Sequence, residues 1–306
     1  DKQVRPAGYM LDKEQLWHES RTHDKNLQRF HLLLMGGDQI YFDSIWEDVK
    51  ELKGWIGLPR EQQLVFPVDP ELEARIEDYY LNLYADRWLP KERGDWDAKT
   101  KPLDAAQAMA RTPTVMMWDD HDIFDGWGSY SCEMQHSPLF KKLFHHARRA
   151  FWVFQMQHAA ESLPDLEPRD DVKVRANDPL FKEIEWKTVL KGDALALPLL
   201  NKQPGFSFTH AIGPVQLLVA DLRTERSHEQ VLGPETWTAL KAWLEQIPEN
   251  GRKHPGEGCQ HLLFMSSVPV VHPKLSLAEA FLDNFGSDDV LDSSADDLKD
   301  HWTHDD

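Results

Sequence analysis

The 306-residue sequence has little cysteine and no long apolar run, and both absences limit its class. Cys132 and Cys259 are its only cysteines, which excludes a disulfide framework, a Cys-x-x-Cys zinc site and a dithiol redox motif. No apolar run is long enough for a transmembrane helix, and the N-terminus shows no signal-peptide pattern. We therefore predict a soluble chain without a membrane segment. The cytoplasm is favoured over secretion, although a removed signal would leave the same sequence.

Positive charge is also scarce, with 34 Lys and Arg against 52 Asp and Glu, giving a net charge of -18. Such a chain repels nucleic acids and anionic membranes at long range, so we expect no nucleic-acid-binding surface. A phosphate-bearing ligand would need local cations or a bound metal ion. Hydrophobic residues make up 41% of the chain, which is enough for a substantial core.

Short apolar segments alternate with helical patterns, which predicts an α/β fold with mixed sheets flanked by helices. Ser44 and Glu47 have the spacing of a capping box, and Ser137-Pro138 is typical of a helix start. The expected strands are 31–35, 112–118, 206–210, 215–220 and 261–265. The expected helices are 13–19, 44–55, 71–89, 104–111, 137–160 and 234–248.

Polar residues follow two of these strands directly. The first strand breaks at two glycines and is followed by Asp38, Tyr41 and Asp43, while the second runs into residues 119–122, Asp-Asp-His-Asp. Clustered carboxylates repel one another unless a cation is present, so these segments favour a metal site with a proton carrier. A plain strand end with a helix-capping aspartate is the alternative for the first segment.

Two later strands end in the same way, at Asp221-Leu222-Arg223 and at residues 266–269, Ser-Ser-Val-Pro. In open α/β sheets, ligands bind outside the carboxyl ends of the strands. The four strand ends together predict a two-metal hydrolase, in which each ligand comes from a different strand and one carboxylate bridges the ions.

The segments Gly-Asp-Gln-Ile-Tyr at 37–41 and Trp-Asp-Asp-His-Asp at 118–122 resemble the PhoD-like alkaline phosphatase family of the calcineurin-like metallophosphoesterases. The resemblance runs from about residue 27 to the end of the chain. It implies a four-layer αββα sandwich, of which this chain would supply half or more. We expect one partial domain over residues 1–306, with a helical insertion at about 134–200.

The resemblance implies metal ligands at Asp38, Tyr41, Asp120 and Asp221. Asp38 occupies the position of the bridging aspartate, and Tyr41 that of a phenolate that binds ferric iron. Asp120 stands where the superfamily has a metal-binding asparagine, and the role of Asp221 is the least defined. Two ions are expected, Fe(III) together with Ca, Mn or Zn as candidates.

The same resemblance gives His121 and Arg223 catalytic roles in cleaving a small phosphate mono- or diester. A hydroxide activated by the cations would attack phosphorus in line while His121 assists the leaving group. Arg223 would hold phosphate oxygens, with a plain salt bridge as the equal alternative. Asp43 is expected to support the site or cap a helix.

Two motifs of the superfamily have no counterpart in this sequence, an early first-ligand motif and a closing histidine motif. The chain is therefore predicted to be part of a larger protein, or a protein that has lost the chemistry. Two other functions stay open: a non-catalytic binding or scaffold module, and a metal-dependent hydrolase of a substrate other than phosphate. The sequence leaves the oligomeric state open.

Overall fold

A computed structural model describes residues 32–88, 109–110, 112–168, 186–189, 205–227, 230–253, 259 and 261–270. These residues form helices and small sheets, which confirms the predicted mixed α/β class. The helix predicted at 13–19 and most of the one predicted at 104–111 lie outside the described residues. Within them, no helix is both long and apolar enough to cross a membrane.

Two parallel strands carry the first two polar segments. Strand β1 (Leu33–Met35) pairs with β2 (Thr114–Met116), and Met35 lies opposite Met116 at their carboxyl ends. The chain segments that follow the two strands therefore leave the sheet at the same edge. This arrangement confirms the expectation that residues 36–43 and 119–122 meet.

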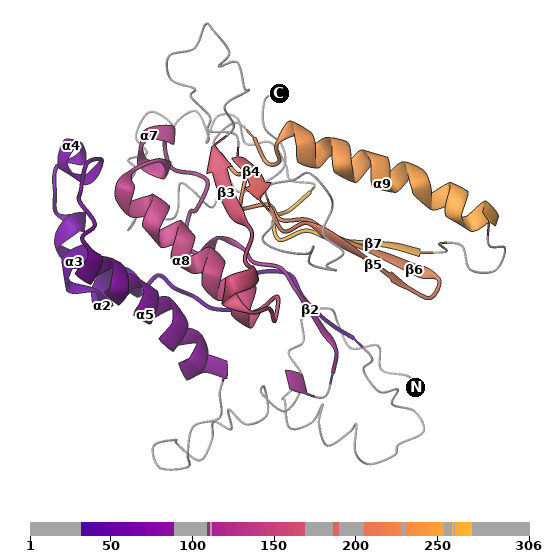
Figure 1. Cartoon of the computed structure of the whole chain (residues 1–306), viewed down its shortest axis with the longest axis horizontal. Helices are drawn as coiled ribbons and strands as arrows, with labels where there is room; N and C mark the ends of the chain where they lie inside the picture. Colours follow the sequence, from indigo (N-terminus) through magenta and orange to yellow (C-terminus); the bar gives the residue numbers. More distant parts are fainter. Residues whose placement is uncertain are drawn as a thin grey trace, which may run out of the picture.

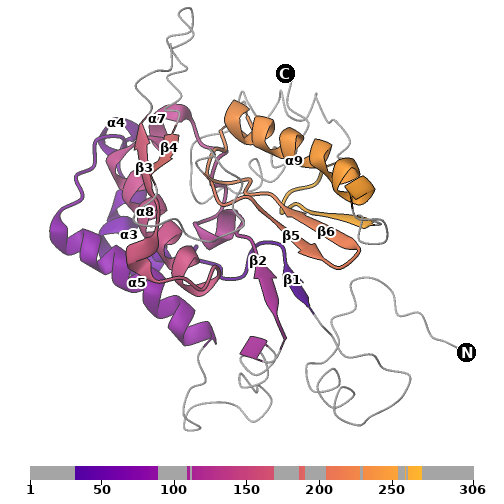
Figure 2. The same cartoon turned by 45° about the vertical axis from the view of Figure 1, so that its right-hand side comes forward.

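A second sheet is mixed, as predicted. Strands β5 (Phe208–Ile212) and β6 (Val215–Val219) form an antiparallel hairpin, and β7 (His261–Met265) pairs parallel to β6. Helix α9 (Pro234–Lys253) lies along this sheet in both views (Figures 1 and 2). Its Leu240 and Trp243 pack with apolar residues of the sheet and its loops. The helix continues beyond its predicted end near Pro248.

Helices α5 (Pro70–Trp88) and α8 (Pro138–Phe154) lie side by side and supply much of the core (Figure 1). In α5 the buried residues are Leu72, Ile76, Tyr80 and Tyr84, a spacing of four that places them on one face. The side chain of Ser137 accepts a hydrogen bond from the backbone N–H of Phe140, which confirms the predicted cap of α8.

The described residues also form four short helices: α2 (Ile45–Asp48), α3 (Lys50–Ile56), α4 (Arg60–Gln63) and α7 (Cys132–Gln135). The capping box predicted at Ser44 is absent, because the Ser44 side chain makes no cap hydrogen bond. Its Oγ lies 2.5 Å from the Tyr79 hydroxyl instead. Tyr79 of α5 is thus the partner of the Ser44 hydroxyl, in place of the nearby backbone N–H that a capping box would use.

The span predicted as a helical insertion contains α8 and the short 3-10 helix η2 (Ala160–Ser162). It also contains an antiparallel pair, β3 (Asp165–Pro168) with β4 (Trp186–Val189). Residues 169–185 and 190–200 of this span lie outside the described residues.

Candidate metal centre

A tight glycine loop brings the two polar segments together. Gly37 has φ 131°, and a Cβ built there would lie 2.6 Å from the Cβ of Asp119. Only glycine fits this close approach. Asp38 follows with φ 54°, a left-handed conformation that is costly for a residue with a side chain and that clusters at functional sites.

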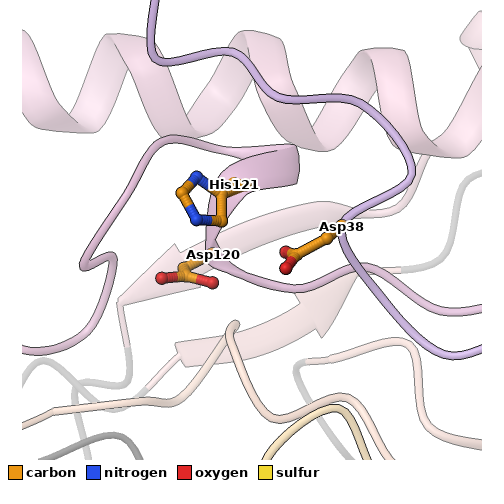
Figure 3. A group of neighbouring side chains, drawn as sticks. All are labelled: Asp38, Asp120 and His121. Carbon is orange, nitrogen blue, oxygen red and sulfur yellow. The ribbon is translucent and has the colours of Figure 1, made fainter. Parts of the chain in front are cut away.

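The structure brings together Asp38, Asp120 and His121. One ligand atom from each lies within 4.8 Å of the others, and Figure 3 shows the two carboxylates and the imidazole around a common space. Asp120 and His121 come from the short 3-10 helix η1 (Asp120–Asp122), which follows β2. Three of the six predicted site residues therefore converge, from the ends of two strands.

The cluster has the chemistry of a cation site. Burial raises the pKa of Asp38, and the nearby charge of Asp120 raises it further. The Oδ1 atom of Asp38 is buried and has no hydrogen-bond partner in the described part of the chain. A hard cation would relieve both the repulsion and the missing contact, so the residues present fit a metal ion.

His121 is held by a second carboxylate. Its Nδ1 lies 2.8 Å from Oδ2 of Asp43, and its Nε2 lies 3.9 Å from Oδ1 of Asp125. Burial alone would lower the pKa of the imidazole. The hydrogen bond to Asp43 and the charges of Asp43, Asp120 and Asp38 outweigh burial and raise this pKa to about 9. With this raised pKa the imidazole carries a proton at neutral pH and can donate it.

Tyr41 lies at the rim of the cluster with 56% of its surface exposed. Its hydroxyl donates to Oδ2 of Asp38 at 3.4 Å, and its ring centroid lies 4.2 Å from that of His121. Burial and the neighbouring carboxylates raise the pKa of its phenol. The structure thus places Tyr41 beside the cluster, and its role as an iron ligand stays a prediction.

Asp221 is buried and lies outside the Asp38–Asp120–His121 cluster. Its carboxylate accepts hydrogen bonds from Trp118 Nε1 at 2.7 Å and from the backbone N–H of Phe206 at 2.8 Å. It also accepts from the backbone N–H groups of Arg223 and Thr224 and from the Thr224 hydroxyl. These contacts join the loop after β6 to the strand end that carries Asp120.

Arg223 is buried beside Asp120 and is 1% exposed. Its Nε donates to Oδ1 of Asp119, its Nη2 to Oδ1 of Asp120 at 3.3 Å, and its Nη1 to the Trp127 carbonyl at 3.0 Å. The salt bridge that the sequence left open is therefore present. A contact with phosphate oxygens stays a prediction.

Asp122 has a role that the sequence did not indicate. Its buried carboxylate accepts hydrogen bonds from the backbone N–H groups of Gln39 and Ile40, each at 3.1 Å, and of Asp119 at 2.9 Å. Gln155 Nε2 adds a fourth at 2.8 Å. Asp122 therefore joins the loop of Asp38 to the segment of Asp120. The Asp-Asp-His-Asp motif contains this residue, but Gln39, Ile40 and Gln155 lie more than thirty positions away.

Two carboxylates and an imidazole that meet at the ends of strands are a donor set that can hold a metal ion. Comparison with known families identifies the chain more narrowly. The family described as PhoD related phosphatase matches residues 9–176 and 198–289, and the chain belongs to this family. The predicted family resemblance is confirmed.

A curated relative comes from Saccharomyces cerevisiae and carries the description "Uncharacterized protein YGR266W". It is 26% identical over 318 residues, which cover 95% of this chain and 42% of the yeast protein. The chain thus spans about two fifths of the length of this relative. No solved structure matches the chain.

Proposed function

We propose that this chain carries a metal-dependent phosphoric ester hydrolase site that acts on small phosphate mono- or diesters. Membership of the PhoD related phosphatase family supports phosphatase chemistry. The convergence of Asp38, Asp120 and His121 is the observation that carries the proposal. We further propose that the sheets form part of a four-layer αββα sandwich.

Asp38 and Asp120 would hold the metal, with Asp38 in the bridging role that the family resemblance implies. Oδ1 of Asp38 has no hydrogen-bond partner among the described residues. Fe(III) with Ca, Mn or Zn is the proposed pair, with Tyr41 as the ligand that selects iron. When bound, such cations supply Lewis-acid stabilisation and lower the pKa of a water nucleophile.

His121 would act as the general acid. Because Asp43 accepts a hydrogen bond from Nδ1, the Nε2–H faces away from Asp43 and can protonate the leaving oxygen of the ester. Asp43 is a positioning residue in this account, since it fixes the tautomer and the orientation of the imidazole. This role is more specific than the supporting or helix-capping role expected from the sequence.

The contacts of the two remaining predicted residues favour supporting roles. Arg223 offsets the negative charge of Asp119 and Asp120 from behind the site, which lowers the repulsion within the cluster. Asp221 holds Trp118 and the backbone of residues 223–224 in place. Both residues are expected to be needed for a stable site.

The test is turnover of an aryl phosphate monoester and diester by the purified full-length protein, supplied in turn with Fe, Mn, Zn and Ca. We expect Asp38→Asn and His121→Ala to lower kcat at least a hundredfold. Asp69→Asn is the matched control, because the exposed Asp69 caps α5 far along the chain and Asn also caps helices.

Unchanged turnover in Asp38→Asn would refute the mechanism. A wild-type protein that binds metal and phosphate without turnover would instead favour a binding module. Turnover of a carboxylic ester without turnover of phosphate esters would favour the other hydrolase class.

A further inference from the structure

The turn after β7 lies next to the glycine loop that carries Asp38. A Cβ built at Gly36 would lie 3.6 Å from Cγ of Met265, the last residue of β7. One position after Gly36 and two after Met265, a Cβ built at Gly37 would lie 3.1 Å from Cβ of Ser267. The Ser267 side chain therefore lies against the backbone that leads directly into the metal cluster.

The two adjacent serines of this turn are bonded differently. The Ser266 hydroxyl donates to the backbone carbonyl of Val268 at 2.6 Å, which closes the turn. The Ser267 hydroxyl oxygen is buried and has no hydrogen-bond partner in the described part of the chain. A buried hydroxyl without a partner lowers the stability of the protein, so its presence at this place indicates a binding role.

A second buried oxygen near Ser267 also has no hydrogen-bond partner in the described part of the chain. This oxygen is Oδ1 of Asp38, and Gly37, against which Ser267 lies, directly precedes Asp38. The two side chains differ in chemistry, because an ionised carboxylate can only accept whereas a hydroxyl can also donate. The carboxylate suits a cation, and the hydroxyl suits an anionic oxygen.

We propose that Ser267 is a substrate-binding residue whose hydroxyl donates a hydrogen bond to a non-bridging oxygen of the phosphoryl group. This inference rests on the proposed function of the Asp38–Asp120–His121 site. The cluster itself consists largely of acceptors, and Arg223 already donates to Asp119, Asp120 and the Trp127 carbonyl. A neutral hydroxyl adds a donor without adding charge.

Two alanine variants make the test, Ser267→Ala and the neighbouring control Ser266→Ala. Inorganic phosphate is the probe, and its affinity for the Mn-loaded full-length protein is measured by calorimetry. We expect Ser267→Ala to weaken phosphate binding about three- to tenfold, the loss of one hydrogen bond. Its metal-free Tm should equal or exceed that of the wild type, because an unsatisfied polar group is removed.

Ser266→Ala should give the opposite pattern, a lower Tm and an unchanged affinity for phosphate, since it loses a bond that closes the turn. Manganese is titrated alone as a further measurement. We expect Ser267→Ala to bind Mn as the wild type does, because the hydroxyl contacts phosphate and not the ion.

Equal phosphate affinity in Ser267→Ala and wild type would overturn the inference, and so would a weakened affinity for Mn alone. A lower Tm in Ser267→Ala would also contradict it, because the hydroxyl would then have a structural partner. The proposed function has a separate failure: a wild-type protein that neither binds phosphate nor cleaves aryl phosphates. In that case both the function and the role of Ser267 are refuted.

Discussion

Replacing Asp122 by Asn is the perturbation that tests most sharply how the site is held together. The carboxylate accepts from the backbone N–H groups of Gln39, Ile40 and Asp119 and from Gln155 Nε2, so every one of these neighbours is a donor. An amide of the same shape keeps one oxygen and turns an NH2 group toward at least one donor. At about 1–3 kcal/mol for each buried donor left unpaired, we expect the free energy of unfolding to fall by about 2–4 kcal/mol.

The substitution should also weaken metal binding. Gln39 and Ile40 belong to the loop of Asp38, and Asp119 directly precedes Asp120, so both ligands would lose their fixed direction without being removed. Changes to groups that orient metal ligands typically weaken metal affinity about ten- to a hundredfold. We expect a loss of this size for Mn binding by Asp122→Asn.

The assay combines urea unfolding, followed by tryptophan fluorescence, with calorimetric titration of Mn. Thr236→Val serves as the control, because its buried hydroxyl donates to Oε2 of Glu225 at 2.5 Å and neither residue belongs to the metal cluster. We expect this variant to lose about 1 kcal/mol of stability and to keep wild-type Mn affinity. Mn affinity in Asp122→Asn equal to that of Thr236→Val would refute the reasoning.

Three further outcomes are expected. Burial lowers the pKa of His146 to about 4; the charge of His145 reinforces this shift and Glu73 opposes it. The neutral imidazole therefore contributes stability that is present above pH 6.5 and is lost as pH falls through 4. Urea unfolding of His146→Gln should therefore show up to about 3 kcal/mol less pH dependence between pH 7 and 4 than the wild type, and an equal dependence would contradict this. Burial raises the pKa of Glu225 to about 7, against hydrogen bonds from Thr236 and Gly233, so this contribution has the opposite sign: it is present below pH 4.5 and is lost as pH rises through 7. Between pH 5 and 8 the free energy of unfolding of Glu225→Gln should decline by about 3 kcal/mol less than that of the wild type. An equal decline in the two proteins would show that the raised pKa of Glu225 is wrong. Iron-loaded protein should show a visible charge-transfer band that disappears in Tyr41→Phe, and a colourless iron-loaded wild type would exclude a phenolate ligand.

Local patterns predicted the elements that depend on near neighbours. Apolar residues that recur every three or four positions between residues 72 and 88 predicted α5 almost to the residue, because one face of such a helix is buried whatever covers it. The cap at Ser137 was predicted for the same reason, since its partner Phe140 lies three residues away. The capping box predicted at Ser44 was wrong, because the Ser44 hydroxyl contacts Tyr79, which lies 35 positions away in the sequence.

The candidate site shows the same division. Asp38, Asp120 and His121 could be predicted to meet, because parallel strands place their carboxyl ends at one edge of a sheet. The bond of Asp221 to Trp118 and that of Arg223 to Asp119 could not be predicted. These pairs lie 103 and 104 positions apart, and their contact depends on how two sheets approach each other. The roles of Asp122 and Ser267 depend in the same way on contacts with the glycine loop, which no local spacing indicates.

The most direct test of the account is the metal content of purified wild-type and Asp38→Asn protein after Mn loading and exhaustive dialysis, measured by elemental analysis. The account predicts that the wild type retains bound Mn and that Asp38→Asn loses most of it, while circular dichroism shows both proteins folded. Equal metal content in the two proteins would contradict the claim that the ends of β1 and β2 form a metal centre.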